Sequence, residues 1–339
     1  MKNLFISFEF EKYFQEYPFV MVDIGARGGI PKSWGALSKY LKVIGFEPDK
    51  QEYIKLSGRK NQEYHTKYLD IALSDEKKSI KFHVTKGAWL SSVFYPNQTL
   101  LDKFSKTWGE SLTTIELEAD TLDNQLKENQ INDVDLIKLD TQGSELLILK
   151  GSTGVFNNQV IGVESEIEFV DVYKDQPLFS EVDLFLRKYR FHLMEIIRSK
   201  YWKRPVDNKF VRSRGQIMYG DVLYLKEVDA FFEMISGIHD ESFKKAKILK
   251  ALVMSILYEH MDYGFEIIQR AIQGGLFNEK EKQLLRDYIN KQKRIDLIAE
   301  FLNKLPEFRG KIRLFIILYY LRNLFRKKEN RWANGAIWR

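Results

Sequence analysis

The sequence predicts an α/β protein: a Rossmann-like, doubly wound sheet of about seven main strands, followed by a C-terminal α-helical domain. Two observations lead to this fold class. Short apolar runs alternate with helical segments between residues 19 and 226, the pattern of an α/β sheet. After residue 227 the apolar residues recur at helical spacing and no convincing strand follows. We therefore expect a lead-in helix over 1–18, a sheet domain over 19–227 and a helical domain over 228–339.

Each expected element follows from its pattern of apolar residues. Buried parallel strands appear as short, nearly continuous apolar runs, whereas 79–84 alternates like a half-exposed strand. The expected strands are 19–22, 41–46, 64–73, 79–84, 113–118, 134–140, 160–167, 191–197 and 216–225, the last two as an antiparallel pair at the end of the sheet. The expected helices within this region are 31–40, one beginning at 52, 122–129, 146–150 and 179–189.

Composition excludes several classes of protein and site. The 339 residues are 44% hydrophobic and include no cysteine, so disulfide scaffolds, cysteine-zinc sites and thiol nucleophiles are excluded. No apolar run is long enough to span a membrane, and the N-terminal stretch is a poor signal peptide. We therefore expect a cytoplasmic protein. The net charge of +6 permits an anionic substrate, a membrane surface or nucleic acid, and does not choose among them.

A glycine turn joins the first two expected strands. The first strand ends in Asp23-Ile24-Gly25-Ala26-Arg27-Gly28-Gly29, and the second ends in Glu47. Strand, glycine turn, helix and a strand ending in an acid form a nucleotide-binding βαβ unit, in which the acid binds the ribose hydroxyls. This pattern makes Glu47 the candidate ribose ligand.

The spacing of the glycines indicates which nucleotide binds. A dinucleotide site uses G-x-G-x-x-G to bind a pyrophosphate, whereas here Asp23 precedes the first glycine and disfavours phosphate. S-adenosylmethionine (SAM) carries an amino group and a sulfonium but no phosphate, so it is the predicted cofactor. The alternative is a doubly wound fold that binds another ligand or none. The predicted SAM ligands are Asp23, Gly25, Arg27, Gly29, Glu47 and, at the adenine end, Asp75.

Several spaced motifs resemble one family. They are Asp23-Ile24-Gly25, Gly45-Phe46-Glu47-Pro48, Thr121-Leu122-Asp123, the run from Val134 to Glu145, Leu149-Lys150-Gly151, Gly162-Val163-Glu164 and Gly220-Asp221-Val222-Leu223-Tyr224. Together they closely resemble the FkbM family of methyltransferases over roughly residues 19–226. The resemblance implies a class I SAM-dependent O-methyltransferase acting on sugars, polyketides or other hydroxylated metabolites. Arg27 departs from the glycine of many class I enzymes. It either contacts the methionine carboxylate of SAM or points to solvent.

Methyl transfer to a hydroxyl requires a group that accepts the hydroxyl proton. Asp140 and Glu164 fall at the carboxyl ends of expected strands, and ligands of doubly wound sheets bind beyond these ends. Asp140 is therefore the first candidate base and Glu164 the second. His83 is a third candidate, although a lone histidine on an alternating strand is more often structural. Glu145, in the first turn of a helix, favours a structural role. Alternatively, Asp140 and Glu164 bind a divalent ion, but no tight ligand motif is found, so a metal-independent reaction is favoured.

Two segments carry the candidate acceptor-binding residues. The long loop 86–99 contains Trp89, Ser91 and Ser92, and long irregular loops are usually functional. The basic loop 199–214 contains Trp202, Lys203 and Arg204, which suit an anionic glycan and equally permit nucleic acid. The structural alternatives are that Trp89 packs over the sheet and that the basic loop is simply solvated.

Residues 311–328 are strongly apolar between flanking cations. The uncharged run is too short to span a bilayer, so the segment either packs as a buried helix, forms an oligomer interface or lies at a membrane surface. Membrane association and a homo-oligomer therefore stay open as alternatives.

The function predicted from these features is methyl transfer from SAM to a hydroxyl, in a surface polysaccharide or a glycosylated metabolite. The glycan or other hydroxylated acceptor is the expected partner, and nucleic acid is disfavoured. Two rivals are kept: an RNA methyltransferase, and a non-catalytic SAM-fold scaffold whose helical part binds a partner.

Overall fold

The computed structural model describes residues 8–30, 32–59, 65–206 and 212–290. These residues form two compact units. A sheet unit contains residues 19–30 and 41–236, and a helical unit contains 8–18, 32–40 and 237–290. The domain limits expected from the sequence, at 18/19 and 227/228, stay predictions.

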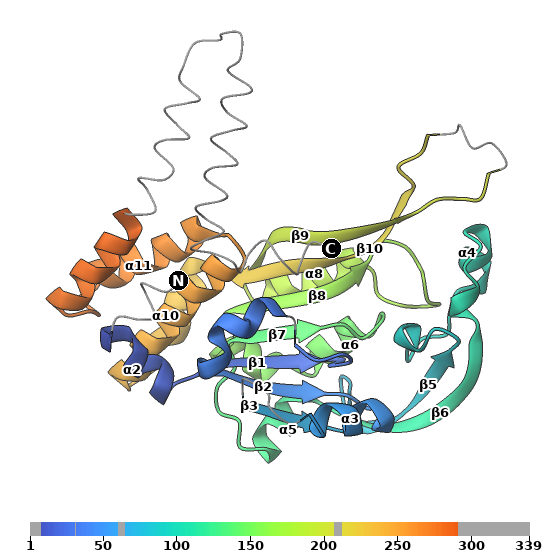
Figure 1. Cartoon of the computed structure of the whole chain (residues 1–339), viewed down its shortest axis with the longest axis horizontal. Helices are drawn as coiled ribbons and strands as arrows, with labels where there is room; N and C mark the ends of the chain where they lie inside the picture. The colour runs from blue at the N-terminus through green and yellow to red at the C-terminus, as the bar shows by residue number, and fades with distance from the viewer. Residues whose placement is uncertain (1–7, 31, 60–64, 207–211, 291–339) are drawn as a thin grey trace, which may run out of the picture. The chain divides into compact units, whose positions relative to one another are not determined.

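The sheet unit is built on seven strands in the order β3-β2-β1-β7-β8-β10-β9 (Figure 1). Pairing along the sheet is parallel from β3 to β8, and β10 runs antiparallel to both β8 and β9. This arrangement confirms the predicted seven-stranded fold and its antiparallel closing pair. The strands are β1 (Phe19–Ile24), β2 (Leu41–Phe46), β3 (His65–Leu69), β7 (Leu136–Leu139), β8 (Gly162–Glu168), β9 (Phe191–Trp202) and β10 (Gln216–Lys226).

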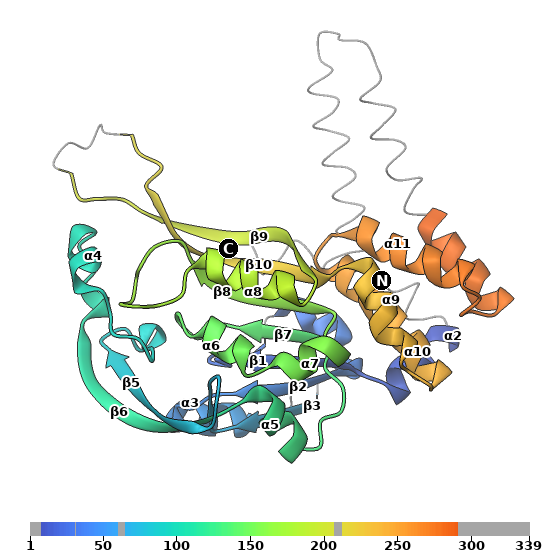
Figure 2. The same cartoon turned by 180° about the vertical axis from the view of Figure 1, so that it is seen from behind.

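Helices cover one face of this sheet. Alternate strand residues such as Val22, Ile137 and Val163 are fully buried in one cluster with apolar residues of four helices. These helices are α5 (Leu122–Glu128), α6 (Glu145–Lys150), α7 (Thr153–Asn158) and α8 (Phe179–Lys188). Figure 2 shows α6 and α8 on the same side of the sheet. The burial of these side chains explains the apolar runs in the sequence.

A second, three-stranded sheet has the order β4-β6-β5. Its strands are β4 (Ala72–Leu73), β5 (Lys78–Thr85) and β6 (Ser111–Asp120). The single strand expected over 64–73 is therefore two strands, β3 and β4, which belong to different sheets. A periodic pattern indicates a strand but not its partner, so the small sheet was not predicted. Short helices connect these parts: α3 (Lys50–Ser57), η2 (Ala88–Leu90), α4 (Gln98–Lys103) and η3 (Thr107–Gly109).

The helical unit contains α2 (Phe8–Glu16), η1 (Lys32–Tyr40), α10 (Glu241–Leu257), α11 (Met261–Gln273) and a helical segment over 279–290. Glu281 is fully buried there and accepts hydrogen bonds from Tyr13 Oη at 2.6 Å and Lys245 Nζ at 3.0 Å. The helix expected over 31–40 is a 3₁₀ helix, and Gly35, a weak α-helix former, lies near its middle. Helix α9 (Val228–Ser236) belongs to the sheet unit.

The helical region expected after the sheet is present as far as residue 290. Residues 311–328, considered above as a membrane or oligomer contact, lie outside the described residues. Among the residues that the structure describes, no helix is both long and apolar enough to cross a membrane.

Candidate active site

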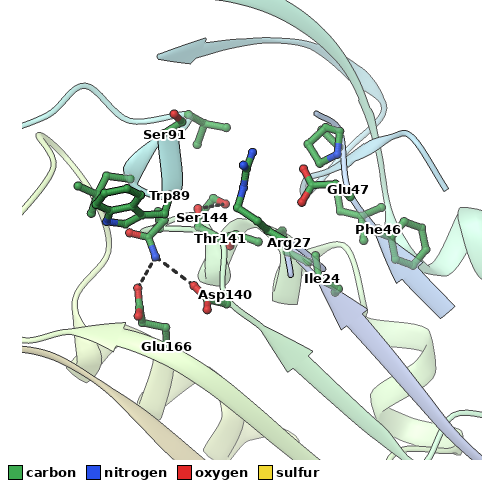
Figure 3. Close-up of a pocket in the computed structure, with 18 of the residues that line it drawn as sticks. Ile24, Arg27, Phe46, Glu47, Trp89, Ser91, Asp140, Thr141, Ser144 and Glu166 are labelled. Atoms are coloured by element: carbon green, nitrogen blue, oxygen red, sulfur yellow. Dashed lines mark hydrogen bonds between the residues drawn. The ribbon is translucent and has the colours of Figure 1, made fainter. Parts of the chain in front are cut away.

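A pocket of about 470 Å³ lies at the carboxyl ends of β1, β2 and β7. Pockets for small molecules have roughly this size and occur at this position in α/β sheets. The small sheet contributes Ile80 and Phe82, and the neighbouring helix η2 contributes Ala88, Trp89 and Leu90. In the view of Figure 3, Glu47 lies on one side of the pocket and Glu166 on the other, with Arg27 between them.

Glu47 lines the pocket directly after β2 and is only 4% exposed. Its Oε1 accepts a hydrogen bond of 3.0 Å from the backbone N–H of Asp49, and no described residue donates to Oε2. Burial raises the pKa of Glu47, while this N–H and the charge of Arg27 oppose that shift. Asp49 in turn caps helix α3 and pairs with Arg27 at 2.7 Å. The carboxylate is thus held in place with one oxygen available to a ligand.

Gly25 forms the turn between β1 and the pocket. Its φ of +76° is in the left-handed region, and its N–H donates to Phe46 O at 3.0 Å. A Cβ atom on Gly25 would lie 2.1 Å from the carbonyl oxygen of Asp140. Only glycine therefore allows the chain after β1 to approach the chain after β7 this closely. Of the six predicted SAM ligands, Gly25, Arg27 and Glu47 line the pocket.

Asp23 points away from the pocket and into a row of charged side chains. In the sheet register Asp23 lies beside Lys138, and Lys138 beside Glu164. The Nζ atom of Lys138 is 3.2 Å from Oδ1 of Asp23. Burial alone would lower the pKa of Lys138, but the charges of Asp23, Asp140 and Glu164 raise it overall. Neither Asp23 nor Glu164 lines the pocket, so the structure does not bring these two predicted residues to it.

Gly29 and Asp75 also lie outside the pocket lining. Gly29 has a φ of +82°, and a Cβ atom there would meet Nη1 of Arg59 at 2.5 Å. Asp75 pairs with Lys78 at 2.6 Å and accepts a hydrogen bond from Ser74. Gly29 therefore lies against the side chain of Arg59, and the carboxylate of Asp75 is bonded to its sequence neighbours.

Two carboxylates line the pocket together. The side-chain nitrogen of Gln142 donates to Asp140 Oδ1 at 3.0 Å and to Glu166 Oε1 at 2.6 Å, as the dashed lines in Figure 3 show. Tyr173 Oη donates to Gln142 Oε1 at 3.0 Å, so the amide is fixed at both ends. Burial raises the pKa of Glu166 well above its ordinary value, and the negative charge of Asp140 raises it further. We call Asp140, Gln142 and Glu166 the carboxylate–amide group.

Sequence reasoning found Asp140 but missed Gln142 and Glu166. The signal for Glu166 was present, because Glu164, Glu166 and Glu168 alternate along one strand and so share a face. Glu166 lies two residues closer than Glu164 to the carboxyl end of β8, where ligands bind. The expected strand was ended one residue early and Glu164 was chosen.

Glu145 fixes the turn that carries Gln142. It accepts hydrogen bonds from Thr141 N at 2.7 Å, Thr141 Oγ1 at 2.9 Å and Gly143 N at 2.9 Å. Gln142 and Gly143 have φ angles of +58° and +100°, so the turn has an uncommon backbone shape. Burial raises the pKa of Glu145 to about 7, despite these donors. The contacts of Glu145 are those of a structural residue.

His83 lies on the outer face of the small sheet. Its neighbour Phe82 lines the pocket, and successive side chains of a strand point to opposite faces. Nδ1 of His83 is 2.9 Å from Thr114 Oγ1. Burial and the charge of Lys81 lower the pKa of His83. The structure thus does not bring this third candidate base to the pocket.

The predicted acceptor-binding residues separate into two groups. Trp89, which is 65% exposed, and Ser91 line the pocket. Ser92 is buried and its hydroxyl donates to Gln142 O at 2.6 Å, so it helps to hold the turn that carries Gln142. Trp202 lies among Phe104, Trp108 and Tyr219 in an aromatic cluster, 7% exposed. Lys203 and Arg204 are exposed and lie outside the pocket lining.

Residues that sequence reasoning did not select complete the lining. Arg198, Lys200 and Tyr219 reach the pocket from β9 and β10. Strand β9 extends five residues beyond its expected end at 197, and this extension carries Arg198 and Lys200. Among the described residues, no group of three or more histidine, aspartate or glutamate side chains is arranged to hold a metal ion.

Comparison with protein families identifies the class of this protein. The methyltransferase FkbM domain matches residues 23–193, slightly more than half of the chain. The chain therefore belongs to the FkbM methyltransferase family, which confirms the resemblance noted in its motifs. It is a SAM-dependent methyltransferase. No curated protein matches the chain.

Solved structures of methyltransferases match the chain at low identity. Magnesium protoporphyrin IX methyltransferase from Synechocystis PCC 6803, with bound SAM, is 9% identical; the match covers 66% of this chain and 79% of that chain, with a TM-score of 0.30. A SAM-dependent methyltransferase from Methanosarcina mazei is 11% identical, with coverages of 62% and 95% and a TM-score of 0.28. A 16S rRNA (adenine(1408)-N(1))-methyltransferase from Catenulisporales acidiphilia is 11% identical, with coverages of 64% and 90% and a TM-score of 0.29. We draw no conclusion about the acceptor from these values.

Proposed function

We propose that this protein transfers a methyl group from SAM to a hydroxyl of a sugar, in a surface polysaccharide or a glycosylated metabolite. The observation that carries the proposal is the carboxylate–amide group, which lines the same pocket as Glu47 but comes from different strands. Proton acceptors at the pocket suit a hydroxyl, since an alcohol is a weak nucleophile until a base takes its proton.

The residues after β1 and β2 would hold the cofactor. Glu47 offers an oxygen that lacks a donor among the described residues, which fits the hydroxyl pair of a ribose. Phe46 and Ile71 provide apolar contacts nearby, and Gly25 keeps the turn open to the pocket. When bound, SAM supplies an electrophilic methyl group. The turn after β1 fits SAM better than a dinucleotide, because its sequence from Gly25 to Gly29 does not have the G-x-G-x-x-G pattern that binds a pyrophosphate.

The carboxylate–amide group would act on the acceptor. Asp140 and Glu166 share the donor Gln142 and line the same pocket, so either carboxylate is placed to receive the hydroxyl proton. Burial raises the pKa of Glu166, which makes its carboxylate a stronger base than that of an ordinary glutamate and favours it as the proton acceptor. Gln142 would orient both carboxylates, and its own position depends on Tyr173 and on the turn held by Glu145.

An aromatic residue of the pocket lining supports a sugar acceptor. Trp89 lines the pocket and is 65% exposed, and such a ring offers an apolar face together with a polar edge. Sugars present both C–H faces and hydroxyl edges, so an exposed ring beside carboxylates matches them. Ile80, Phe82 and Leu90 line the adjoining wall and would limit the access of water to the reacting groups.

A direct assay tests this proposal. The purified protein is incubated with SAM and a panel of oligosaccharides, glycosylated metabolites and RNA, and products are examined by mass spectrometry for an added methyl group. We expect methylated sugars, with the activity of the double variant Asp140→Asn, Glu166→Gln lowered by about 10²-fold or more. Methylation of RNA alone would support the rival enzyme, and SAM binding without any product would support the scaffold. Parallel reactions with EDTA and with Mg²⁺ test the predicted independence from metal.

A further inference from the structure

Two cations of β9 line the acceptor side of the pocket. Arg198 and Lys200 are two residues apart on one strand, so their side chains leave the same face. In the sheet register Arg198 lies beside Asp221, and Lys200 beside Tyr219, which also lines the pocket. The pocket therefore combines the carboxylates of Asp140 and Glu166 with two positive charges.

Arg198 and Lys200 each keep hydrogen-bond donors that can bind a negatively charged ligand. Arg198 uses Nε for an ion pair of 2.7 Å with Asp221, and no described residue accepts a hydrogen bond from its two terminal nitrogens. Burial lowers the pKa of Arg198, but Asp221, Glu166 and Asp140 raise it overall, which shows that its charge lies within reach of the carboxylate–amide group. Lys200 is exposed and has no ion pair within the described part of the chain. Arg27, by contrast, is paired with Asp49.

These positions fit an acceptor that brings its own negative charge. A guanidinium and an ammonium in one pocket, each with free donors, bind carboxylates and phosphates through charge-assisted hydrogen bonds. A neutral sugar has no carboxylate or phosphate to offer to Arg198 and Lys200. The aromatic rings of Trp89 and Tyr219 line the same pocket and would contact the apolar part of the same ligand.

We propose that the acceptor is an acidic sugar, whose carboxylate or phosphate binds Arg198 and Lys200 while its hydroxyl meets the carboxylate–amide group. The inference rests on the proposed function and narrows its substrate class. The negative group would lie near the methylated hydroxyl, because Arg198 lines the same pocket as Glu166 and Asp140. Recognition by charge would separate acidic from neutral glycans before any methyl transfer.

The test measures binding of three small probes to the full chain saturated with S-adenosylhomocysteine. Methyl glucuronide carries a carboxylate, glucose 1-phosphate carries a phosphate, and methyl glucoside is neutral. In calorimetric titrations we expect at least one acidic probe to bind about tenfold or more tightly than the neutral one. A preference for the carboxylate identifies a uronic acid as the acceptor, and a preference for the phosphate identifies a sugar phosphate.

Variants link the preference to the two cations. Lys200→Gln should reduce the affinity for the acidic probe about tenfold and leave the affinity for methyl glucoside unchanged. Lys188→Gln, which removes an exposed lysine of α8, makes the same change in net charge and should have no effect. Binding of S-adenosylhomocysteine by each variant shows that it is folded.

Three results would overturn the inference. Equal affinity of the wild type for acidic and neutral sugars would remove it and leave the proposed function intact. The same would follow if Lys200→Gln behaved like Lys188→Gln. Binding of no sugar, combined with binding of an RNA oligonucleotide, would overturn both the inference and the proposed function.

Discussion

The side-chain nitrogen of Gln142 lies 2.6 Å from Oε1 of Glu166 and 3.0 Å from Oδ1 of Asp140. One amide thus holds two carboxylates that come from different strands, after β7 and on β8. Because both carboxylates accept hydrogen bonds from the same nitrogen, replacing one of them changes the hydrogen bonding of the other. This coupling makes the pair, rather than either residue alone, the unit to test.

The first prediction concerns that pair. Glu166→Gln and Asp140→Asn should each lower kcat by about 10²-fold or more, the usual contribution of a general base. The double variant should lose little more than the worse single variant, because residues that act as a unit are not additive. Affinity for SAM should stay near that of the wild type in all three. Steady-state kinetics and calorimetry measure the two quantities.

The pH dependence of the same reaction supplies a sharper readout. Burial raises the pKa of Glu166, so this carboxylate takes up a proton at a higher pH than an ordinary glutamate does, and kcat should fall as the pH falls through that pKa. In Glu166→Gln this fall should move to lower pH. Glu118→Gln, an exposed carboxylate of β6, is the control and should keep the wild-type profile. An unchanged profile in Glu166→Gln would remove Glu166 from the proton transfer.

The second prediction concerns cofactor binding. Glu47→Ala should weaken SAM and S-adenosylhomocysteine by tenfold or more, about 1.4 kcal/mol, because a charged hydrogen-bond acceptor is lost from a buried position. Glu47→Gln keeps one acceptor and should show a smaller loss. Calorimetric titration measures both, and the exposed Glu76→Ala serves as the control. Full affinity in Glu47→Ala would show that the ribose binds elsewhere.

The third prediction compares two glycines of the same turn. Gly25 and Gly28 both have positive φ angles, of +76° and +84°. Gly28→Ala should cost about 1–2 kcal/mol of stability from backbone strain alone, because its Cβ would meet nothing within 4 Å. Gly25→Ala adds a clash with Asp140 O and should cost more. Denaturant unfolding measures the free energies, and equal losses would contradict the role given to this close approach.

The fourth prediction concerns Lys226, whose Nζ donates to the carbonyl oxygens of Phe156 at 2.7 Å and Tyr189 at 3.0 Å. Burial lowers the pKa of Lys226 from 10.5 to about 8. Between these values the unfolded chain holds the proton and the folded chain has released it. The contribution of Lys226 to stability therefore rises with pH in this window, by up to about 1.4 kcal/mol per pH unit.

Lys226→Met tests this sign. The free energy of unfolding of the wild type minus that of the variant should increase between pH 8 and pH 10.5. Contributions from tyrosines and other lysines cancel in the difference. Lys188→Met, at an exposed position, should give a difference that does not change with pH. A flat difference for Lys226→Met as well would show that its amine keeps its proton in the folded chain.

The sequence predicted the large sheet well because its strands are buried. Runs such as Phe19–Ile24 and Leu41–Phe46 are apolar along nearly their whole length, which is the pattern of strands buried on both faces. The small sheet was harder to predict from the sequence. Its strand Ser111–Asp120 is mostly exposed, and no local signal shows that it pairs with Lys78–Thr85 rather than with the large sheet. Pairing of strands is a property of the whole chain, not of a segment.

The candidate site was predictable where local chemistry decided it. Glu47 and Gly25 follow apolar strands, and their place at the carboxyl ends follows from topology. Asp23 does not line the pocket: β1 continues to Ile24, so the side chain of Asp23 leaves the opposite face of the strand from Val22 and Ile24. Trp202 was expected to stack on a ligand, but burial among other aromatic rings occupies it. Neither effect can be read from a motif.

The order of the two units along the chain limits how the protein can be truncated. The polypeptide leaves the sheet unit after β1, forms η1 within the helical unit, and returns to begin β2. Trp34 of η1 and Tyr258 after α10 have their rings 6.2 Å apart within the helical unit. A protein truncated after residue 236 would therefore keep Trp34 and Leu37, which are buried apolar residues of the helical unit, but would lose the part of that unit that follows residue 236. A soluble minimal enzyme would need codons 32–40 redesigned as a short polar link as well.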